Sequence, residues 1–276
     1  SMPGVGCRPY MSMVTSRGCP FQCAYCHQTM GKVFRKRSAQ SVLAEMEELR
    51  SRHGFKEFEI LDDCFNLDRR RMLEILTGIH DRIKDARLHF PNALRTDMLE
   101  PEDMLLYKQA GTVSVHFAIE TSSPRLQKLI HKNLDLEKAS AVMDASVKAG
   151  IYSSGYFMIG FPTETFEEGS ATVDFAVRSN LHRALFFNPK PFAGTELARM
   201  ADDFQKSRDN LSDTKKANYC KDTINISAMS DNELQTIFQN AYKRFYMNPK
   251  RILRLIVLII NNPEVFTMKR LLGMLL

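Results

Sequence analysis

Three cysteines lie close together near the start of the chain, at Cys19, Cys23 and Cys26, in the stretch VTSRGCPFQCAYC. Thiolates at this spacing can hold three corners of an iron–sulfur cube from a single loop, and such soft ligands suit iron and sulfide. The next cysteine is Cys64, so one iron would keep an open position for a substrate or cosubstrate, as a catalytic zinc does. The spacing therefore favours a reactive cluster.

A zinc knuckle or half of a zinc ribbon is the alternative metal site. Zinc sites usually repeat a C-x2-C pair and add a second pair or histidines at regular spacing, whereas His27 adjoins the last cysteine and His53 is remote. The other thiols (Cys7, Cys64 and Cys220) are too scattered for a second cluster, and we expect them to be buried small apolar residues. Six cysteines spread over 276 residues do not resemble a disulfide framework, which predicts a reducing, cytoplasmic compartment.

The cysteine motif, with Tyr25 directly before Cys26, resembles the signature of the radical S-adenosylmethionine (radical SAM) enzymes. The resemblance implies a [4Fe–4S] cluster whose fourth iron is chelated by the amino and carboxylate groups of S-adenosylmethionine. One electron passed to the sulfonium would then give methionine and a 5′-deoxyadenosyl radical. An external reductant of the flavodoxin or ferredoxin type is implied as a partner.

Strand and helix patterns alternate along the first two thirds of the chain. Apolar runs predict strands at 10–16, 58–61, 88–90, 113–119, 156–159 and 184–187, with helices at 38–54, 68–84, 101–111, from 123, at 136–149 and at 166–179. Such alternation indicates a parallel α/β sheet, and a doubly wound sheet is an equal candidate on the pattern alone. The family resemblance implies an open six-stranded (β/α)6 partial TIM barrel over residues 7–200, with the cluster at the carboxyl edge of the strands.

Polar residues follow the second and third predicted strands. Asp62 and Asp63 end the second strand, where the family resemblance implies a group that binds the ammonium of S-adenosylmethionine; an N-cap of the following helix is the alternative. Arg95 follows the third strand. Its guanidinium would either hold the methionine carboxylate as a bidentate pair or lie on the surface.

Two further motifs end the fourth and fifth strands. Glu120, in AIETS, resembles the Gly-Ile-Glu-Ser sequence of the family, which lies near the cosubstrate. Gly160, Phe161 and Pro162, in GFPTET, are similar to the Gly-Phe-Pro-Gly-Glu-Thr turn that faces the adenine. Thr163 replaces a glycine there, so we expect a changed backbone angle. After the sixth strand, NPKPFAGT resembles a Pro-x-Pro-Gly-Thr turn with one inserted residue; an ordinary proline turn is the alternative.

Together with the tail sequence FYMNPKRI, these motifs resemble the branch of the family that usually carries an N-terminal cobalamin-binding domain. Many members of that branch are methyltransferases, and others perform cyclisations or rearrangements. Because the chain starts close to the cluster strand, the sequence predicts either truncation or a reaction without cobalamin. We expect methylation or another C–H functionalisation of a small or lipid-like substrate. The alternatives are modification of transfer RNA and an inactive scaffold.

Residues 201–276 form a different region. Residues 202–228 are polar and are expected to be a linker or a lid; a capping box at Ser230 and Glu233 then opens a helix, and Asn-Pro pairs at 248 and 262 predict two more. Apolar runs at 255–260 and 271–276 stand beside basic residues. They would pack against the barrel or a neighbouring domain, or lie on a membrane as a peripheral anchor. The net charge of +6 permits an anionic partner, but no RNA-binding motif accompanies it.

Overall fold

The computed structural model describes residues 9–27, 29–208 and 225–261. Six parallel strands form one sheet in the order β1-β4-β5-β6-β7-β8. The strands are β1 (Tyr10–Met13), β4 (Glu57–Ile60), β5 (Arg87–Leu94), β6 (Thr112–Glu120), β7 (Tyr152–Met158) and β8 (Arg183–Phe187). Because β1 and β8 are the two edges, the sheet is open, and the predicted six-stranded α/β architecture is confirmed.

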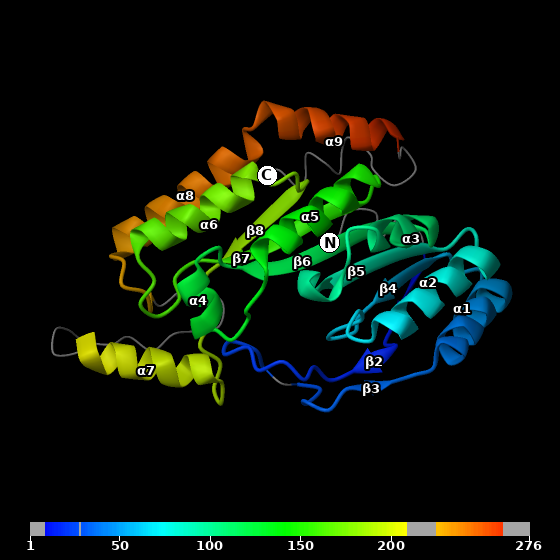
Figure 1. The fold of residues 1–276 in the computed structure, drawn as a ribbon, viewed down its shortest axis with the longest axis horizontal. Coiled ribbons are helices and arrows are strands. Elements are labelled where there is room, and N and C mark those ends of the chain that lie inside the picture. The colour runs from blue at the N-terminus through cyan, green and yellow to red at the C-terminus, as the bar shows by residue number, and fades with distance from the viewer. Residues whose placement is uncertain (1–8, 28, 209–224, 262–276) are drawn as a thin grey trace.

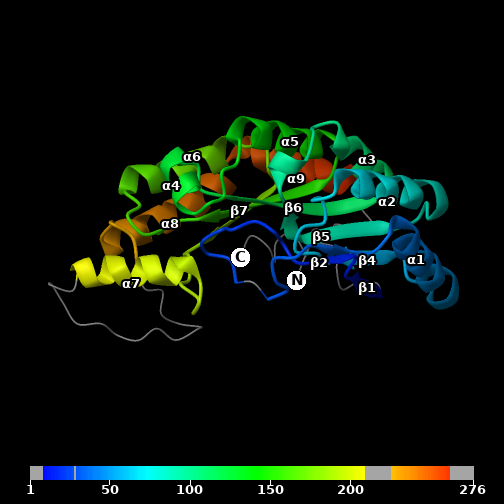
Figure 2. The same ribbon diagram turned by 60° about the horizontal axis from the view of Figure 1, so that its bottom comes forward.

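Helices cover one face of this sheet. They are α1 (Ala39–His53), α2 (Arg69–Arg82), α3 (Asp103–Gln109), α4 (Pro124–Leu129), α5 (Leu136–Lys148) and α6 (Phe166–Arg178). Figure 2 shows α2, α3, α5 and α6 on the convex side of the curved sheet, while the loop after β2 lies on the other side. The sheet therefore has a helical outer layer and a concave inner face.

Alternation along the strands separates the two faces. On β6, Val115, Phe117 and Ile119 are buried in the core against the helices, so Ser114 and His116 face the concave side. Burial lowers the pKa of His116 to about 4, which keeps its ring neutral at physiological pH. The side of the sheet that faces the helices is thus apolar, whereas the concave side carries polar groups.

Local signals place the helices as predicted. Ser38, Asp68, Asp135 and Thr165 are N-caps whose side chains accept backbone N–H groups, and the side chain of Ser230 caps α8 (Asp231–Tyr246) in the predicted capping box. Since Asp68 caps α2, the alternative that Asp62 or Asp63 would do so is wrong. β5 is longer than predicted, as it runs from Arg87 to Leu94.

Four elements were not predicted. β2 (Ser16–Arg17) and β3 (Arg35–Lys36) pair antiparallel, a short 3-10 turn covers Thr96–Met98, and α7 (Glu196–Arg208) occupies part of the expected polar linker. The linker prediction is wrong for residues 202–208 because Leu197 and Ala201 recur on one apolar face that packs with Phe161. The side chain of Thr195 accepts the N–H of Ala198 and so begins this helix.

The C-terminal helices pack against the barrel. Leu234, Ile237 and Phe245 of α8 join the main core, and α9 (Pro249–Asn261) follows. One stripe of α9 is exposed and apolar: Ile252, Leu253, Ile256, Val257 and Ile260. None of the helices among the described residues is long and apolar enough to cross a membrane. Membrane or domain contact by this stripe, and the division at residue 200, stay predictions; the helix expected from Asn262 lies outside the described residues.

Candidate active site at the carboxyl edge of the sheet

The cluster loop, residues 18–34, begins and ends in the β2–β3 ribbon. Gly18 has a φ of 85°, and a Cβ there would lie 2.2 Å from the carbonyl oxygen of Val33. The N–H of Cys19 donates to the carbonyl of Gly31 at 3.1 Å. Only glycine fits this position, because the two arms of the loop lie against each other there.

Backbone hydrogen bonds tie the loop to the far side of the sheet edge. The N–H of Ala24 donates to the carbonyl of Ile130 at 3.0 Å, and the carbonyl of Ala24 accepts the N–H of Leu197 at 2.9 Å. Cys23 and Cys26 flank Ala24 in the sequence. Their sulfurs are therefore held near the end of α4 and the start of α7.

The three cysteines differ in exposure: Cys26 is exposed, and Cys19 and Cys23 are partly buried. Among the described residues, no three His, Cys, Asp or Glu side chains converge closely enough for a single metal ion. Thiolates that hold a four-iron cube stand further apart, because each binds a different iron.

Cys64 is buried, as predicted, but it also contacts the cluster loop. Its thiol hydrogen-bonds the sulfur of Cys19, which lowers the pKa of Cys19 to about 6. The same contact, together with burial, raises the pKa of Cys64. The lowered pKa favours the thiolate form of Cys19, which is the form that binds iron. Cys7 and Cys220 lie outside the described residues.

Asp62 and Asp63, which follow β4, differ in burial and in their hydrogen-bond partners. Asp62 is buried and accepts hydrogen bonds from the N–H and hydroxyl of Thr15, at 2.6 and 2.5 Å, and from the Ser16 hydroxyl at 2.5 Å. It therefore anchors the chain that enters the cluster loop. Asp63 is exposed and accepts the N–H of Gly18 with one oxygen, at 2.8 Å.

Arg95 lies directly beneath the cluster loop. Its guanidinium donates to both carboxylate oxygens of Asp97, at 3.0 and 2.8 Å, and to the carbonyl of Lys132 at 3.0 Å. The guanidinium also lies 3.6 Å from the centre of the Phe21 ring and 3.9 Å from the sulfur of Cys23. Arg95 is 7% exposed, so the alternative of a surface arginine is wrong.

Glu120 ends β6 in a strained conformation beside the loop. Its φ is 69°, a value that costs a non-glycine residue about 1–3 kcal/mol and is typical of functional sites. The Tyr25 hydroxyl donates to Oε1 of Glu120 at 2.9 Å, and Nζ of Lys132 lies 3.6 Å from the same oxygen. Oε2 is buried and has no hydrogen-bond partner in the described part of the chain. Burial and the Glu120 charge hold the pKa of Tyr25 well above its usual value.

The turn after β7 is organised by Glu164. One oxygen of its buried carboxyl accepts the N–H groups of Gly160 and Phe161, at 2.6 and 2.8 Å. Phe161 and Pro162 are buried, and the Phe161 ring lies 6.2 Å from the ring of Tyr25. The GFPTET turn therefore borders the cluster loop.

Thr163 keeps the backbone angle that glycine would favour. Its φ is 65°, so the expectation of a changed angle is wrong. Arg125 explains how a β-branched residue is held there, since its guanidinium donates to the hydroxyl of Thr163 at 2.8 Å and to its carbonyl at 2.9 Å. After β8, the NPKPFAGT turn is also more than a bend, because it supplies the N-cap Thr195.

The radical SAM superfamily model matches residues 13–176. This match covers the cluster loop, four of the six sheet strands (β4, β5, β6 and β7) and the Glu120 and Gly160 motifs. The chain belongs to the radical SAM superfamily. It is thus a member of an enzyme family, and the resemblance found in the sequence is confirmed.

Relatives of this radical SAM chain include two methyltransferases. The chain is 30% identical to an uncharacterized methyltransferase of Pyrococcus horikoshii, over 89% of this chain and 53% of the relative. It is 33% identical to the cytidylyl-2-hydroxyethylphosphonate methyltransferase of Streptomyces wedmorensis, over 68% of this chain and 36% of the relative. The chain therefore spans about half or less of the length of these relatives.

A solved structure shares the fold. The radical S-adenosylmethionine methyltransferase TsrM of Kitasatospora setae, with cobalamin and a [4Fe–4S] cluster bound, superposes with a TM-score of 0.65 over 79% of this chain and 44% of that chain, at 21% identity. The likeness confirms the open α/β barrel of the radical SAM chain.

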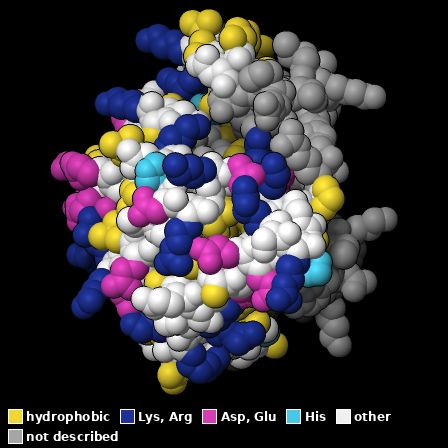
Figure 3. Space-filling view, turned by 90° about the vertical axis from the view of Figure 1, so that its right-hand side faces the viewer, with side chains coloured by type: hydrophobic (Ala, Val, Ile, Leu, Met, Phe, Trp, Pro, Cys, Tyr) yellow, Lys and Arg dark blue, Asp and Glu magenta, His cyan; other side chains and the backbone are white. Residues whose placement is uncertain are grey.

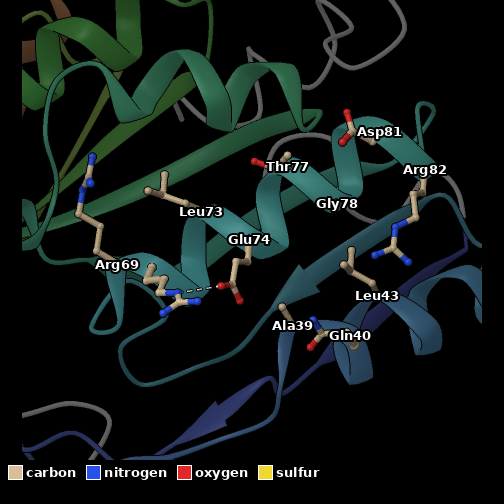
Figure 4. Close-up of a pocket in the computed structure, with 11 residues that line it drawn as sticks. Ala39, Gln40, Leu43, Arg69, Leu73, Glu74, Thr77, Gly78, Asp81 and Arg82 are labelled. Atoms are coloured by element: carbon tan, nitrogen blue, oxygen red, sulfur yellow. Dashed lines mark hydrogen bonds and ion pairs between the residues drawn. The ribbon is translucent and has the colours of Figure 1, made fainter.

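A groove of about 640 Å³ lies elsewhere, on the outer face between α1 and α2. Figure 4 shows Arg69, Glu74 and Arg82 around it, with Gly78 and Leu43 at the helix contact. Each arginine there is already paired: Arg69 with Asp103, Arg70 with Glu74, and Arg82 with Glu47. The groove is a gap between surface helices and lies apart from the cysteines.

Lys132, like Cys64, lies beside the predicted site residues and was not predicted from the sequence. It is 5% exposed, and its neighbours His131 and Asn133 have positive φ values of 54° and 51°. The imidazole Nε2 of His131 lies 3.0 Å from a carboxylate oxygen of Glu196, which holds the turn. The burial of Lys132 and the positive φ values of its two neighbours mark this residue in the structure. Neither feature can be recognised in the sequence, where the lysine simply follows a helix.

Proposed function

We propose that this chain is the radical-generating barrel of a methyltransferase that binds a [4Fe–4S] cluster and S-adenosylmethionine. One observation supports this most directly. Glu120 keeps a buried oxygen without a partner between the cluster loop and the Lys132 ammonium. Buried polar atoms are normally paired, so a polar ligand belongs at this place. A cosubstrate with an ammonium, a carboxylate and ribose hydroxyls has the matching groups.

The donor set fits the proposed cofactors. Cys19, Cys23 and Cys26 would hold three irons, and the family supplies the precedent for a [4Fe–4S] cluster at such a motif. When bound, the cluster supplies one electron to the sulfonium of S-adenosylmethionine, which yields methionine and the 5′-deoxyadenosyl radical. The protein then has to orient the sulfonium and exclude water.

The protein residues divide this work. Glu120 would accept a hydrogen bond from the ammonium or a ribose hydroxyl of the cosubstrate, and the free oxygen of Asp63 is a second acceptor at the neighbouring strand end. Lys132 would pair with the methionine carboxylate. Arg95 was expected in that role, but its Nε and Nη2 bind Asp97 and the Lys132 carbonyl, and its Nη1 is directed at the Cys23 sulfur. We therefore assign it to holding Cys23 and the Phe21 arm of the loop.

The adenine would lie against the GFPTET turn. Glu164 binds the N–H groups of Gly160 and Phe161, which fixes the peptide planes of this turn. A rigid turn beside the Tyr25 ring provides an apolar wall with fixed backbone polar groups, as nucleotide pockets usually do.

Methyl transfer, with cobalamin as the intermediate methyl carrier, is the reaction that the named relatives support. On the concave side of the sheet, Ser114 and His116 are buried, and the half-buried Tyr156, whose ring lies 5.0 Å from that of His116, adds an aromatic group. A small substrate that offers both polar groups and an aromatic or lipid-like part would suit this mixed surface.

An anaerobic assay tests the proposal. The chain is reconstituted with iron and sulfide, and 5′-deoxyadenosine and S-adenosylhomocysteine are quantified after addition of dithionite and S-adenosylmethionine. We expect deoxyadenosine from the wild type and none from Cys23→Ala, and S-adenosylhomocysteine only with added cobalamin. An intact cluster that yields neither product would contradict the proposed activity.

The same assay tests Lys132. Because a hydrogen bond to a charged group contributes about 1.5–3 kcal/mol, Lys132→Met should raise the half-saturating concentration of S-adenosylmethionine roughly 10- to 100-fold. Lys128→Met is the matched control, as Lys128 is an exposed lysine on α4. If the half-saturating concentration of S-adenosylmethionine is the same in both variants, Lys132 does not bind this cosubstrate.

A further inference from the structure

The segment that forms the β2–β3 ribbon and the cluster loop is basic and contains no acidic residue. Residues 14–38 contain five Lys or Arg residues and no Asp or Glu. The β2–β3 ribbon pairs Arg17 directly opposite Arg35, and both are exposed. Like charges directly opposite each other on paired strands repel. Stability of the ribbon alone therefore does not explain this pair.

Neighbouring acids do not neutralise the two arginines. Lys36 forms an ion pair with Asp68, and Arg37 forms one with Glu45. Asp63, an exposed carboxylate after β4, accepts the N–H of Gly18. Within the described ranges, neither Arg17 nor Arg35 takes part in an ion pair. Two positive charges thus remain available to a partner.

Two exposed apolar side chains belong to the cluster loop, between the two strands of the ribbon. Met30 is 43% exposed and Val33 is 68% exposed. The Arg35 guanidinium donates to the carbonyl of Met30 at 2.9 Å, and the Lys32 ammonium donates to the carbonyl of Phe21, so the segment is held in place. Figure 3, viewed from the right-hand side of Figure 1, shows Lys and Arg side chains interspersed with Asp and Glu over that side of the molecule. Exposed apolar side chains near charged ones are typical of transient protein interfaces.

This surface lies directly over a cluster ligand. The carbonyl of Gly31 accepts the N–H of Cys19 at 3.1 Å, and the carbonyl of Val33 blocks any Cβ at Gly18. The backbone of residues 31–33 therefore contacts the backbone of Gly18 and Cys19 directly. A redox protein docked here would lie next to the loop that carries the three cysteines.

We propose that Arg17, Met30, Lys32, Val33 and Arg35, the cluster-loop surface, dock an acidic one-electron carrier protein of the ferredoxin class. The inference rests on the proposed function, because a cluster must be present to accept the electron. One electron leaves the reduced iron–sulfur centre of the carrier, which is oxidised by one unit. The [4Fe–4S] cluster is reduced from the 2+ to the 1+ state, and no proton moves.

Stopped-flow reduction under anaerobic conditions tests the docking surface. The reconstituted chain is mixed with a reduced acidic [2Fe–2S] ferredoxin at low and high salt, and in parallel with reduced methyl viologen, a small cation that needs no docking. Arg35→Glu and Arg17→Glu are compared with Arg178→Glu, which changes the net charge equally at an exposed position on α6.

Charge reversal should lower the rate constant with ferredoxin about tenfold and flatten its salt dependence. In Arg35→Glu and Arg17→Glu, the rates of reduction by methyl viologen and of dithionite-driven cleavage of S-adenosylmethionine should stay within about twofold of wild type. All rates of the control variant Arg178→Glu should also stay within this range. Equal ferredoxin rates in Arg35→Glu and Arg178→Glu would overturn the proposal. A lower rate with both ferredoxin and methyl viologen would also overturn it, because the arginines would then be needed for the integrity of the cluster.

A nucleic-acid surface is the competing explanation. Binding of transfer RNA that is lost in Arg35→Glu while the ferredoxin rate persists would replace the proposed partner. Failure of the proposed function is separate from both results, because the dithionite-driven reaction does not depend on this surface.

Discussion

Glu164 illustrates how single residues serve this site at a cost in stability. Its side chain is buried, and burial raises its pKa to about 7, while one oxygen lacks a partner among the described residues. The acid nevertheless binds two backbone N–H groups of the Gly160 turn. The stability of the turn therefore depends on the protonation of one buried carboxyl group.

The pH dependence of unfolding should reveal Glu164. Between pH 4.5 and 7 the unfolded carboxyl loses its proton while the folded one keeps it, so the free energy of unfolding should fall by about 3 kcal/mol as the pH rises. Glu164→Gln should lack this component in urea titrations of the cluster-free chain at pH 5 and 8. Glu167→Gln, at an exposed position, should keep the wild-type dependence; the same slope in both variants would refute the assignment.

Short motifs drew attention to the cysteines, Glu120 and the Gly160 turn, which the structure places near one another, because spacing along the chain carries their signal. Lys132 and Cys64 were not predicted as site residues. Their roles arise from contacts with Glu120 and Cys19, which are 12 and 45 positions away in the sequence. Such contacts depend on which strand ends meet, and a single sequence without the fold does not show that.

At the scale of elements, Arg251 joins α9 to the barrel. It is 1% exposed, and its guanidinium donates to the carbonyls of Leu181, Phe245 and Ser179, at 2.9, 2.6 and 2.8 Å. Burial lowers its pKa to about 10, so it stays charged at neutral pH. One side chain thus satisfies carbonyls that follow the end of α6 and one carbonyl in the last turn of α8.

Removal of this guanidinium should destabilise the chain markedly. Arg251→Met leaves several buried carbonyls without donors, and we expect a loss of about 3 kcal/mol or more in the free energy of unfolding. Lys250→Met, on the exposed neighbour in the same helix, should change it by about 0.5 kcal/mol or less. Urea denaturation measures both; a difference below about 1 kcal/mol between the variants would contradict the role of Arg251.

Periodicity predicted the longer elements well because caps and apolar faces are local. It failed for α7, where charged residues around Asp202 conceal the narrow apolar face of Leu197 and Ala201, and for β2 and β3, which are two residues each. Elements this short are defined by the pairing itself, and their sequences have no period to detect.

At the scale of the molecule, alternation of strands and helices predicted the parallel sheet but could not distinguish an open barrel from a doubly wound sheet. The strand order decides it, because β1 and β8 lie at opposite edges and the strands between them follow in sequence. This order brings β4, β6 and β7 to one carboxyl edge, where their loops meet the cysteines. The site is thus a property of the topology as much as of the motifs.

Metal analysis of the reconstituted chain tests the central claim most directly. Iron, acid-labile sulfide and zinc are measured in the wild type, Cys23→Ala and Cys64→Ala. We predict about four iron and four sulfide per chain in the wild type, the same in Cys64→Ala, and loss in Cys23→Ala. One zinc per chain without sulfide, or a full cluster in Cys23→Ala, would show that the three-cysteine loop does not hold the cluster on which the account depends.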